Sequence, residues 1–196
     1  MFDKFHEECG VFAIYGHPEA ANLAKLGVYA LQHRGQESAG IAVADGRRVV
    51  AQKDLGLVAQ VFDEPALQAL HGLAAIGHAR YSTTGSSRWP NSQPIVRHRP
   101  GRTIALGHNG NLTNTEELRA KLESEGARFS STSDTEVIAA LIARDARPLE
   151  EAVAATMEEI VGAFSAVVLA DGKLVGFRDP NGIRPLVLGQ IDGDWV

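Results

Sequence analysis

The order of the expected strands and helices is the feature of this 196-residue chain that most constrains its fold. A strand and a helix come first, several strands follow, then two or three helices, and strands return at the end. Dipeptides typical of tight hairpins, Asp45–Gly46 and Asp171–Gly172, each separate two apolar runs. Strands joined by such short turns pair antiparallel. The pattern therefore predicts an antiparallel α+β layered fold rather than a doubly wound parallel sheet.

Apolar periodicity and turn residues locate the individual elements. A helix is expected to begin at Pro18–Glu19. Its buried face should carry the residues spaced at i, i+3, i+7 and i+8, namely Leu23, Leu26, Ala30 and Leu31. Capping-box spacing indicates the starts of two further helices, at Thr113 with Glu116 and at Ser133 with Glu136. The other expected elements are helices at 65–70 and 149–160 and strands at 10–15, 40–44, 49–53, 74–79, 103–107, 164–169, 174–177 and 186–190.

Composition and charge exclude several classes of protein. The formal net charge is −5 and no run of lysines and arginines occurs, so no nucleic-acid partner is expected. No apolar stretch is long enough to cross a bilayer, and residues 1–8 lack the apolar core of a secretory signal. The single cysteine cannot form an internal disulfide, and no Cys/His cluster has zinc spacing. We therefore expect a cytoplasmic protein with no membrane anchor and no metal site in this chain.

Five short polar clusters at the ends of expected elements carry the residues able to do chemistry. They are Cys9–Gly10, LQHRGQESAG at 31–40, GHARYSTTG at 77–85, GHNGNL at 107–112 and TSDTE at 132–136. Taken singly, each has an ordinary structural explanation. A lone cysteine is usually a small buried hydrophobe, Asn109–Gly110 is a common turn dipeptide, and a carboxylate such as Asp134 is favoured in the first turn of a helix.

Taken together and in order, the clusters resemble one enzyme family. The motifs ECGVFAI, LQHRGQESAGI, GHARYSTTG, HNGNLTN, TSDTE and FRDPNGIRPLVLG occur in the same order in the amidophosphoribosyltransferases, which catalyse the first committed step of purine synthesis. The resemblance runs from about Cys9 to the end of the chain. It implies a class II glutamine amidotransferase domain, with the four-layer αββα sandwich of antiparallel sheets found in N-terminal-nucleophile hydrolases. Relative to that family the domain is truncated at its C-terminal end.

The resemblance implies a nucleophile and an oxyanion hole for glutamine hydrolysis. Cys9 would attack the side-chain carbonyl of glutamine and form a γ-glutamyl thioester, with its own α-amine as the base. Asn109 would donate its side-chain amide, and Gly110 its backbone N–H, to the developing oxyanion. Three histidines near these motifs are interpreted as structural rather than as bases: His33, His78 and His108.

The resemblance also implies contacts to the two charged groups of the glutamine backbone. Arg80 would pair with the α-carboxylate in a bidentate fork, and Asp134 would pair with the α-ammonium. Thr83, in the loop after Arg80, resembles a further substrate contact. Arg34 resembles an arginine that supports the loops around the nucleophile.

An α-amine base requires Cys9 to be the first residue of the mature protein. Residues 1–8 are therefore interpreted as a propeptide that ends at the Glu8–Cys9 bond, and the uncleaved form is expected to lack glutaminase activity. Residues 9–196 are expected to be an incomplete glutaminase domain that needs no cofactor. The family continues into a phosphoribosyltransferase domain, absent from this sequence, that binds phosphoribosyl pyrophosphate and Mg²⁺ and in some members carries an iron–sulfur cluster. The full-length enzyme is expected to be a homo-oligomer.

Two alternatives stay open from the sequence. The chain could be the glutaminase domain of another class II amidotransferase, such as asparagine synthetase or glutamate synthase, although the motif at 31–40 disfavours this reading. It could also be a catalytically silent domain that binds glutamine. The joint presence of Cys9, Arg80, Asn109, Gly110 and Asp134 argues against a silent domain, because such a domain has no reason to retain a nucleophile.

Overall fold

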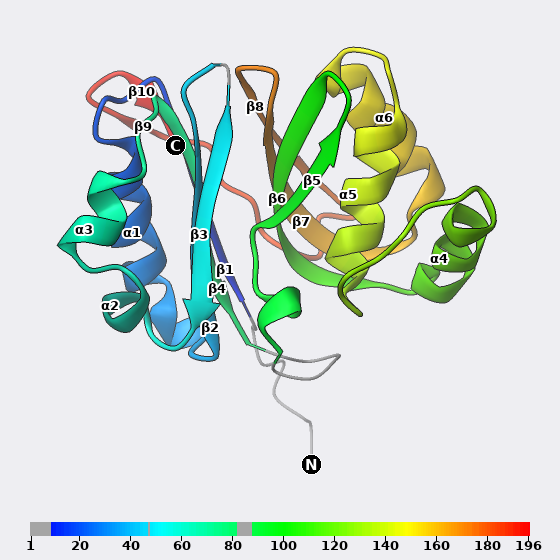
Figure 1. Ribbon diagram of the computed structural model, residues 1–196, viewed down its shortest axis with the longest axis horizontal. Helices are drawn as coiled ribbons and strands as arrows, with labels where there is room; N and C mark the ends of the chain where they lie inside the picture. Colours follow the sequence, from blue (N-terminus) through cyan, green and yellow to red (C-terminus); the bar gives the residue numbers. More distant parts are fainter. Residues whose placement is uncertain (1–8, 47, 82–87) are drawn as a thin grey trace.

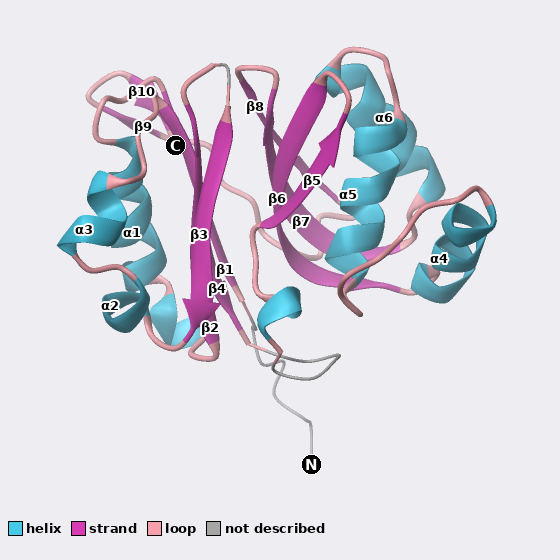
Figure 2. Cartoon of the chain, viewed as in Figure 1, coloured by secondary structure: helices cyan, strands magenta, loops and turns pink. Residues whose placement is uncertain are grey.

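The computed structural model describes residues 9–46, 48–81 and 88–196, and these residues form four layers (Figure 1). Two β-sheets lie face to face, and helices cover the outer face of each sheet (Figure 2). The helices outside the first sheet are α1 (Ala20–Ala30), α2 (Val58–Val61) and α3 (Glu64–Gln68). Those outside the second sheet are α4 (Thr115–Ser124), α5 (Asp134–Arg144) and α6 (Leu149–Glu159). The expected αββα arrangement is confirmed.

Both sheets are antiparallel throughout the described residues. The six-stranded sheet has the order β3–β2–β4–β1–β10–β9, and the four-stranded sheet has the order β5–β6–β7–β8. The strands are β1 (Gly10–Tyr15), β2 (Ser38–Ala44), β3 (Val49–Leu55), β4 (Ala74–Arg80), β5 (Ile95–Arg99), β6 (Arg102–Leu112), β7 (Gly162–Ala170), β8 (Lys173–Arg178), β9 (Gln190–Ile191) and β10 (Asp194–Trp195). The two hairpins predicted at Asp45–Gly46 and Asp171–Gly172 connect β2 to β3 and β7 to β8.

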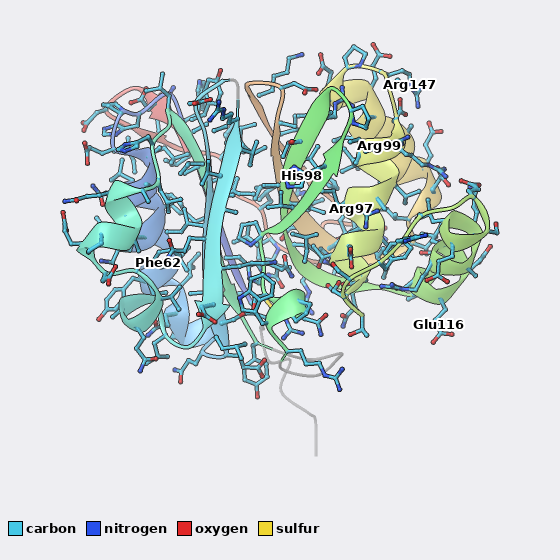
Figure 3. All side chains as sticks on the ribbon, in the orientation of Figure 1. Phe62, Arg97, His98, Arg99, Glu116 and Arg147 are labelled. Carbon is cyan, nitrogen blue, oxygen red and sulfur yellow. The ribbon has the colours of Figure 1, made fainter. Side chains whose placement is uncertain are left out.

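Small and branched side chains fill the space between the two sheets. The buried residues of this layer are Ala42, Ala44, Ala74, Ile76, Ala105, Val167 and Leu169. Because most of them are short, the facing strands β4 and β6 can approach each other closely. A separate core lies under the helices of each sheet; Phe62, labelled in Figure 3, belongs to the one beneath α1 and α2.

Helix α1 buries a different face from the one expected. Its buried residues are Ala20, Ala21, Ala24 and Val28. Of the expected residues, Leu23 packs partly buried against the core, whereas Leu26 is 60% exposed. The reason is the close approach of the helix to β4, where a Cβ added to Gly77 would lie 2.3 Å from Val28 Cγ2. Leucine side chains do not fit such a narrow gap, so the small residues of α1 face the sheet.

The motif HNGN lies inside a strand and not in a turn. β6 continues to Leu112, with Asn109 opposite Ser165 and Gly110 opposite Phe164 in β7. Gly110 has a φ of 140°, and a Cβ at this position would lie 2.1 Å from the carbonyl oxygen of Ala163. Glycine is therefore required here by the close approach of two strands, which sequence spacing alone did not indicate.

Neither of the expected capping boxes forms. Helix α4 follows Asn114 without a side-chain cap. At α5, Ser133 Oγ accepts from the N–H of Thr135 at 3.1 Å, but Glu136 does not return to the Ser133 N–H. Its carboxylate accepts instead from Ser131 N–H and Oγ, each at 2.7 Å. The strand expected at 186–190 is also wrong for residues 186–189, because β9 begins only at Gln190.

Candidate active site

Cys9 directly precedes β1 and is held through its main chain by Arg34. The N–H of Cys9 donates to the carbonyl oxygen of Arg34 at 3.1 Å, and Arg34 Nε donates to the carbonyl oxygen of Cys9 at 2.9 Å. Cys9 has a φ of 72°, in the left-handed region that non-glycine residues seldom adopt. Such a conformation persists where the surroundings impose it, and here the reciprocal contact with Arg34 does so.

The thiol of Cys9 contacts the end of β4. Cys9 Sγ lies 3.3 Å from the carbonyl oxygen of Tyr81, to which it donates, and 3.5 Å from the Tyr81 nitrogen, whose N–H donates to the sulfur. Gly10 is paired with Ala79, so Cys9 lies alongside Arg80 at the same end of the sheet. The first and third sequence clusters, about 70 residues apart in the chain, are thus adjacent in the structure.

Arg80 is the last residue of β4 and is buried. Its guanidinium lies 3.5 Å from Glu37 Oε2, and its carbonyl oxygen accepts from the N–H of Glu37 at 3.0 Å. Glu37 thus contacts both the main chain and the side chain of Arg80. Thr83, the other predicted contact in this cluster, lies outside the described residues.

Asn109 faces a cavity of about 1080 Å³ that it shares with Cys9 and Arg34. The cavity runs between the sheets along β1, β7 and β8 to the segment around Leu188. Asn109 is buried, and among the described residues its Oδ1 has no hydrogen-bond partner. This oxygen is a hydrogen-bond acceptor, and a buried acceptor without a partner is costly, so a ligand that donates a hydrogen bond is favoured beside it.

Asp134 is the first residue of α5, next to the end of β6. Its Oδ1 accepts from the N–H of Thr135 at 2.8 Å, and its Oδ2 accepts from the N–H of Leu112 at 3.1 Å. Burial by itself raises the pKa of this carboxyl, but His108 and the two N–H donors outweigh it and hold the pKa of Asp134 below its ordinary value. Asp134 is therefore an anion at neutral pH. Neither Asp134 nor Arg80 is among the residues that line the cavity.

Sequence reasoning missed the residues that hold the candidate site in place. Glu37 pairs with Arg80, Tyr81 contacts the thiol, and Thr135 lies against Asp134. The available signal was their position, since each lies inside a motif already singled out. Across the described ranges, no group of three or more His, Cys, Asp or Glu is arranged to hold a metal ion, and no helix has the length and apolar character needed to cross a membrane.

Comparisons with a family profile, with curated sequences and with solved structures all lead to the same family. The sequence profile described as "Glutamine amidotransferase domain" matches residues 78–196. The chain is 48% identical over 204 residues to the amidophosphoribosyltransferase of Mycobacterium leprae, covering 100% of this chain and 37% of that protein. It is 49% identical over 196 residues to the amidophosphoribosyltransferase of Synechococcus elongatus, covering 98% of this chain and 40% of that protein. The chain thus spans about two fifths of the length of these curated relatives.

Two solved structures have the same fold. One, described as the allosteric regulatory enzyme of purine biosynthesis, superposes with a TM-score of 0.89 at 39% identity, over 94% of this chain and 40% of that chain. The other is the glutamine phosphoribosylpyrophosphate amidotransferase from Bacillus subtilis in complex with ADP and GMP, with a TM-score of 0.87 at 38% identity over the same shares. The resemblance inferred from the motifs is confirmed. The chain belongs to the glutamine amidotransferase domain family, and the curated relatives that it matches are amidophosphoribosyltransferases.

Proposed function

We propose that this chain is the glutaminase part of an amidophosphoribosyltransferase and that it hydrolyses glutamine to glutamate and ammonia through a thioester on Cys9. The observation that carries the proposal is that Cys9 and Asn109, which come from different sheets, line one cavity. A nucleophile and an oxyanion donor must both face the same substrate carbonyl.

In the proposed reaction, Cys9 Sγ attacks the side-chain carbonyl carbon of glutamine and passes its proton to the free α-amine of Cys9. The carbon–nitrogen bond then breaks, the amine returns the proton to the leaving ammonia, and water hydrolyses the thioester. A free α-amine titrates near pH ~8 and a thiol near ~8.5, so this transfer is almost balanced. Where residues 1–8 remain attached, the Cys9 nitrogen is a peptide nitrogen and cannot act as this base. We therefore propose residues 1–8 as a propeptide and residues 9–196 as the glutaminase domain.

The remaining roles follow from charge and hydrogen-bonding capacity. Asn109 and Gly110 would stabilise the oxyanion, and removal of one such donor typically slows the reaction by about 10²–10³. Arg80 would bind the α-carboxylate, and the low pKa of Asp134 supports a role as the anion that binds the α-ammonium. Thr83 is retained as a further substrate contact, and Arg34 as the residue that fixes the main chain of Cys9.

The larger reaction would need a longer protein. We propose that ammonia formed here reacts with phosphoribosyl pyrophosphate to give 5-phosphoribosylamine for purine synthesis, in a domain outside this sequence. We propose that the longer enzyme binds Mg²⁺, and any iron–sulfur cluster, in that further domain. We also propose that it is a cytoplasmic homo-oligomer. The support for a longer enzyme is that the curated relatives are amidophosphoribosyltransferases of which this chain spans about 37–40%.

The first prediction is that cleavage before Cys9 switches on glutamine hydrolysis. Two forms should be compared, residues 1–196 and residues 9–196, with intact mass confirming each start and ammonia release giving the rate. Only the form that begins at Cys9 should turn over, and Cys9→Ala should abolish both turnover and labelling by an electrophilic glutamine analogue. Full turnover with residues 1–8 still attached would contradict the mechanism. Labelling without turnover in the 9–196 form would favour a silent glutamine-binding domain.

A further inference from the structure

Two buried histidines connect the elements that carry the proposed glutamine contacts. His78 lies two residues before Arg80 in β4, and His108 directly precedes Asn109 in β6. Nε2 of His78 lies 3.0 Å from the carbonyl oxygen of His108. The contact runs from the six-stranded sheet to the four-stranded sheet, and both side chains are buried.

The protonation of His78 follows from its partner. A carbonyl oxygen can only accept, so Nε2 of His78 carries the proton. Burial is the largest influence on this group and lowers the pKa of His78 to about 3, which leaves the ring neutral and its Nδ1 without a proton. Among the described residues, that Nδ1 has no hydrogen-bond partner. His78 therefore acts as a fixed donor to the main chain of β6.

The side chain of His108 points the other way, toward α5. Its Nδ1 lies 3.2 Å from Thr135 Oγ1 and 3.6 Å from Asp134 Oδ1. An ionised carboxylate only accepts, and the Thr135 hydroxyl can accept from one group while it donates to another. The proton of His108 therefore lies on Nδ1, directed at this pair. Nε2 of His108 is buried with no partner among the described residues, as expected for the nitrogen that carries no proton.

We propose that His108 is a positioning residue for glutamine recognition. Its Nδ1–H holds Thr135 and the Asp134 carboxylate in place for the substrate α-ammonium. Its carbonyl, held by His78, fixes β6 against β4, so that Asn109 and Gly110 keep their position relative to Arg80. This inference rests on the proposed function, because it concerns the residues that would bind glutamine.

The tautomers can be measured without any substrate. Long-range ¹H–¹⁵N spectra of the protein labelled at histidine should give the Nε2–H form for His78 and the Nδ1–H form for His108. Thr135→Val removes the nearest acceptor of His108 and should shift its Nδ1 resonance while His78 stays unchanged. A proton on Nε2 of His108 would overturn the proposal. This outcome does not depend on whether the chain hydrolyses glutamine.

Ligand discrimination tests the link to the α-ammonium. L-Glutamine and glutaramate, which differ only in the α-amino group, should be titrated calorimetrically into Cys9→Ala protein, which cannot form the thioester. Three forms should be compared: wild type at position 108, His108→Phe and His108→Asn. Phenylalanine retains a ring beside Phe164 but has no N–H, whereas asparagine keeps a donor near the position of Nδ1. The preference for L-glutamine is the ratio of the Kd of glutaramate to the Kd of L-glutamine. This ratio should fall about tenfold or more in His108→Phe, with the Kd of glutaramate unchanged, and should recover in His108→Asn.

A matched control separates positioning from general damage. His98, labelled in Figure 3, also has Nδ1 next to a threonine, at 3.0 Å from Thr103 Oγ1, but it is exposed on β5. His98→Phe should leave the preference unchanged. Equal weakening of both ligands in His108→Phe would mean a merely structural role and would refute the proposal. If wild type bound neither ligand, the proposed function would be wrong, and the tautomer measurement would still decide whether His108 holds Asp134.

Discussion

Gly110 is a single residue on which the geometry of the proposed oxyanion hole depends. An added Cβ would meet the carbonyl oxygen of Ala163 at 2.1 Å, at a φ of 140° that side chains rarely adopt. We predict that Gly110→Ala lowers the free energy of unfolding by about 3 kcal/mol or more, because a steric clash adds to backbone strain. Thermal and urea unfolding would measure the change.

Gly101 provides the control for this substitution. It also has a positive φ, 82°, but a Cβ added there would meet no atom of the described residues within 4 Å beyond its chain neighbours. Gly101→Ala therefore carries the strain without the clash, and we expect a loss of about 1 kcal/mol. Equal losses in the two variants would show that the approach of β6 to β7 is not what requires glycine at 110.

At this scale, the sequence identified chemical groups better than the contacts that hold them. Arg80 and Asp134 are assigned to the two charges of the ligand through the family resemblance, and their opposite charges are consistent with that assignment, which stays a prediction. Glu37 lies inside a motif already singled out, but its pairing with Arg80, across 43 positions of the chain, could not be predicted. Pairing over such a distance is set by strand register, and no local pattern encodes it.

Among the elements, helix α5 is held at its start by the buried Glu136. Its carboxylate accepts from Ser130 and Ser131, and lies 2.9 Å from a guanidinium nitrogen of Arg97 on β5. Arg97 is labelled in Figure 3. We predict that Glu136→Gln lowers the free energy of unfolding by about 2–4 kcal/mol at pH 7, because several charge-assisted hydrogen bonds are lost together. Denaturant unfolding over a range of pH would measure it.

The pH dependence of this effect has a defined sign. Burial raises the pKa of Glu136, but the Ser131 and Ser130 donors outweigh it and hold the pKa below the ordinary 4.5. The folded state thus favours the ionised form, so the stabilisation is complete above pH 4.5 and is lost as pH falls through the lower folded pKa. The difference in the free energy of unfolding between wild type and Glu136→Gln should therefore decrease below pH 4.5. Glu117, in the first turn of α4, is exposed and provides the control. Glu117→Gln should have the same free energy of unfolding as wild type across this pH range.

Elements whose bounds depend on nearby residues in the sequence were predicted well. Features that depend on packing against other elements were not. The hairpins at 45–46 and 171–172 follow from turn chemistry, and α5 follows from its apolar run and the Ser133 cap. The buried face of α1 depends on the distance to β4, which favours alanine over leucine there. The motif HNGN contains a turn dipeptide, yet β6 passes through it because each residue of the motif pairs with a residue of β7.

For the whole molecule, the two sheets meet over small residues at the centre and open into the large cavity beyond them. Apolar side chains at the far end of this cavity face solvent. Val187 is 84% exposed and Leu188 is 74% exposed, and Tyr15 and Trp195 line the cavity beside them. A single ligand can bury apolar side chains that are gathered around a concave site. Such a group therefore indicates a binding site, whereas hydrophobic side chains scattered over the surface do not.

We therefore predict that an uncharged apolar fluorescent dye such as Nile red binds the folded protein at this cavity. Val187→Lys with Leu188→Lys places two charges on its rim and should weaken dye binding about tenfold or more, since each buried aliphatic side chain contributes about 1.5–3 kcal/mol. Leu26→Lys with Tyr29→Lys is the matched control, because both residues are exposed on α1 and neither lines the cavity. Fluorescence titration at constant ionic strength would measure both. Equal affinity in the two double variants would place the dye elsewhere, and would mean that the opening between the sheets does not behave as one apolar site.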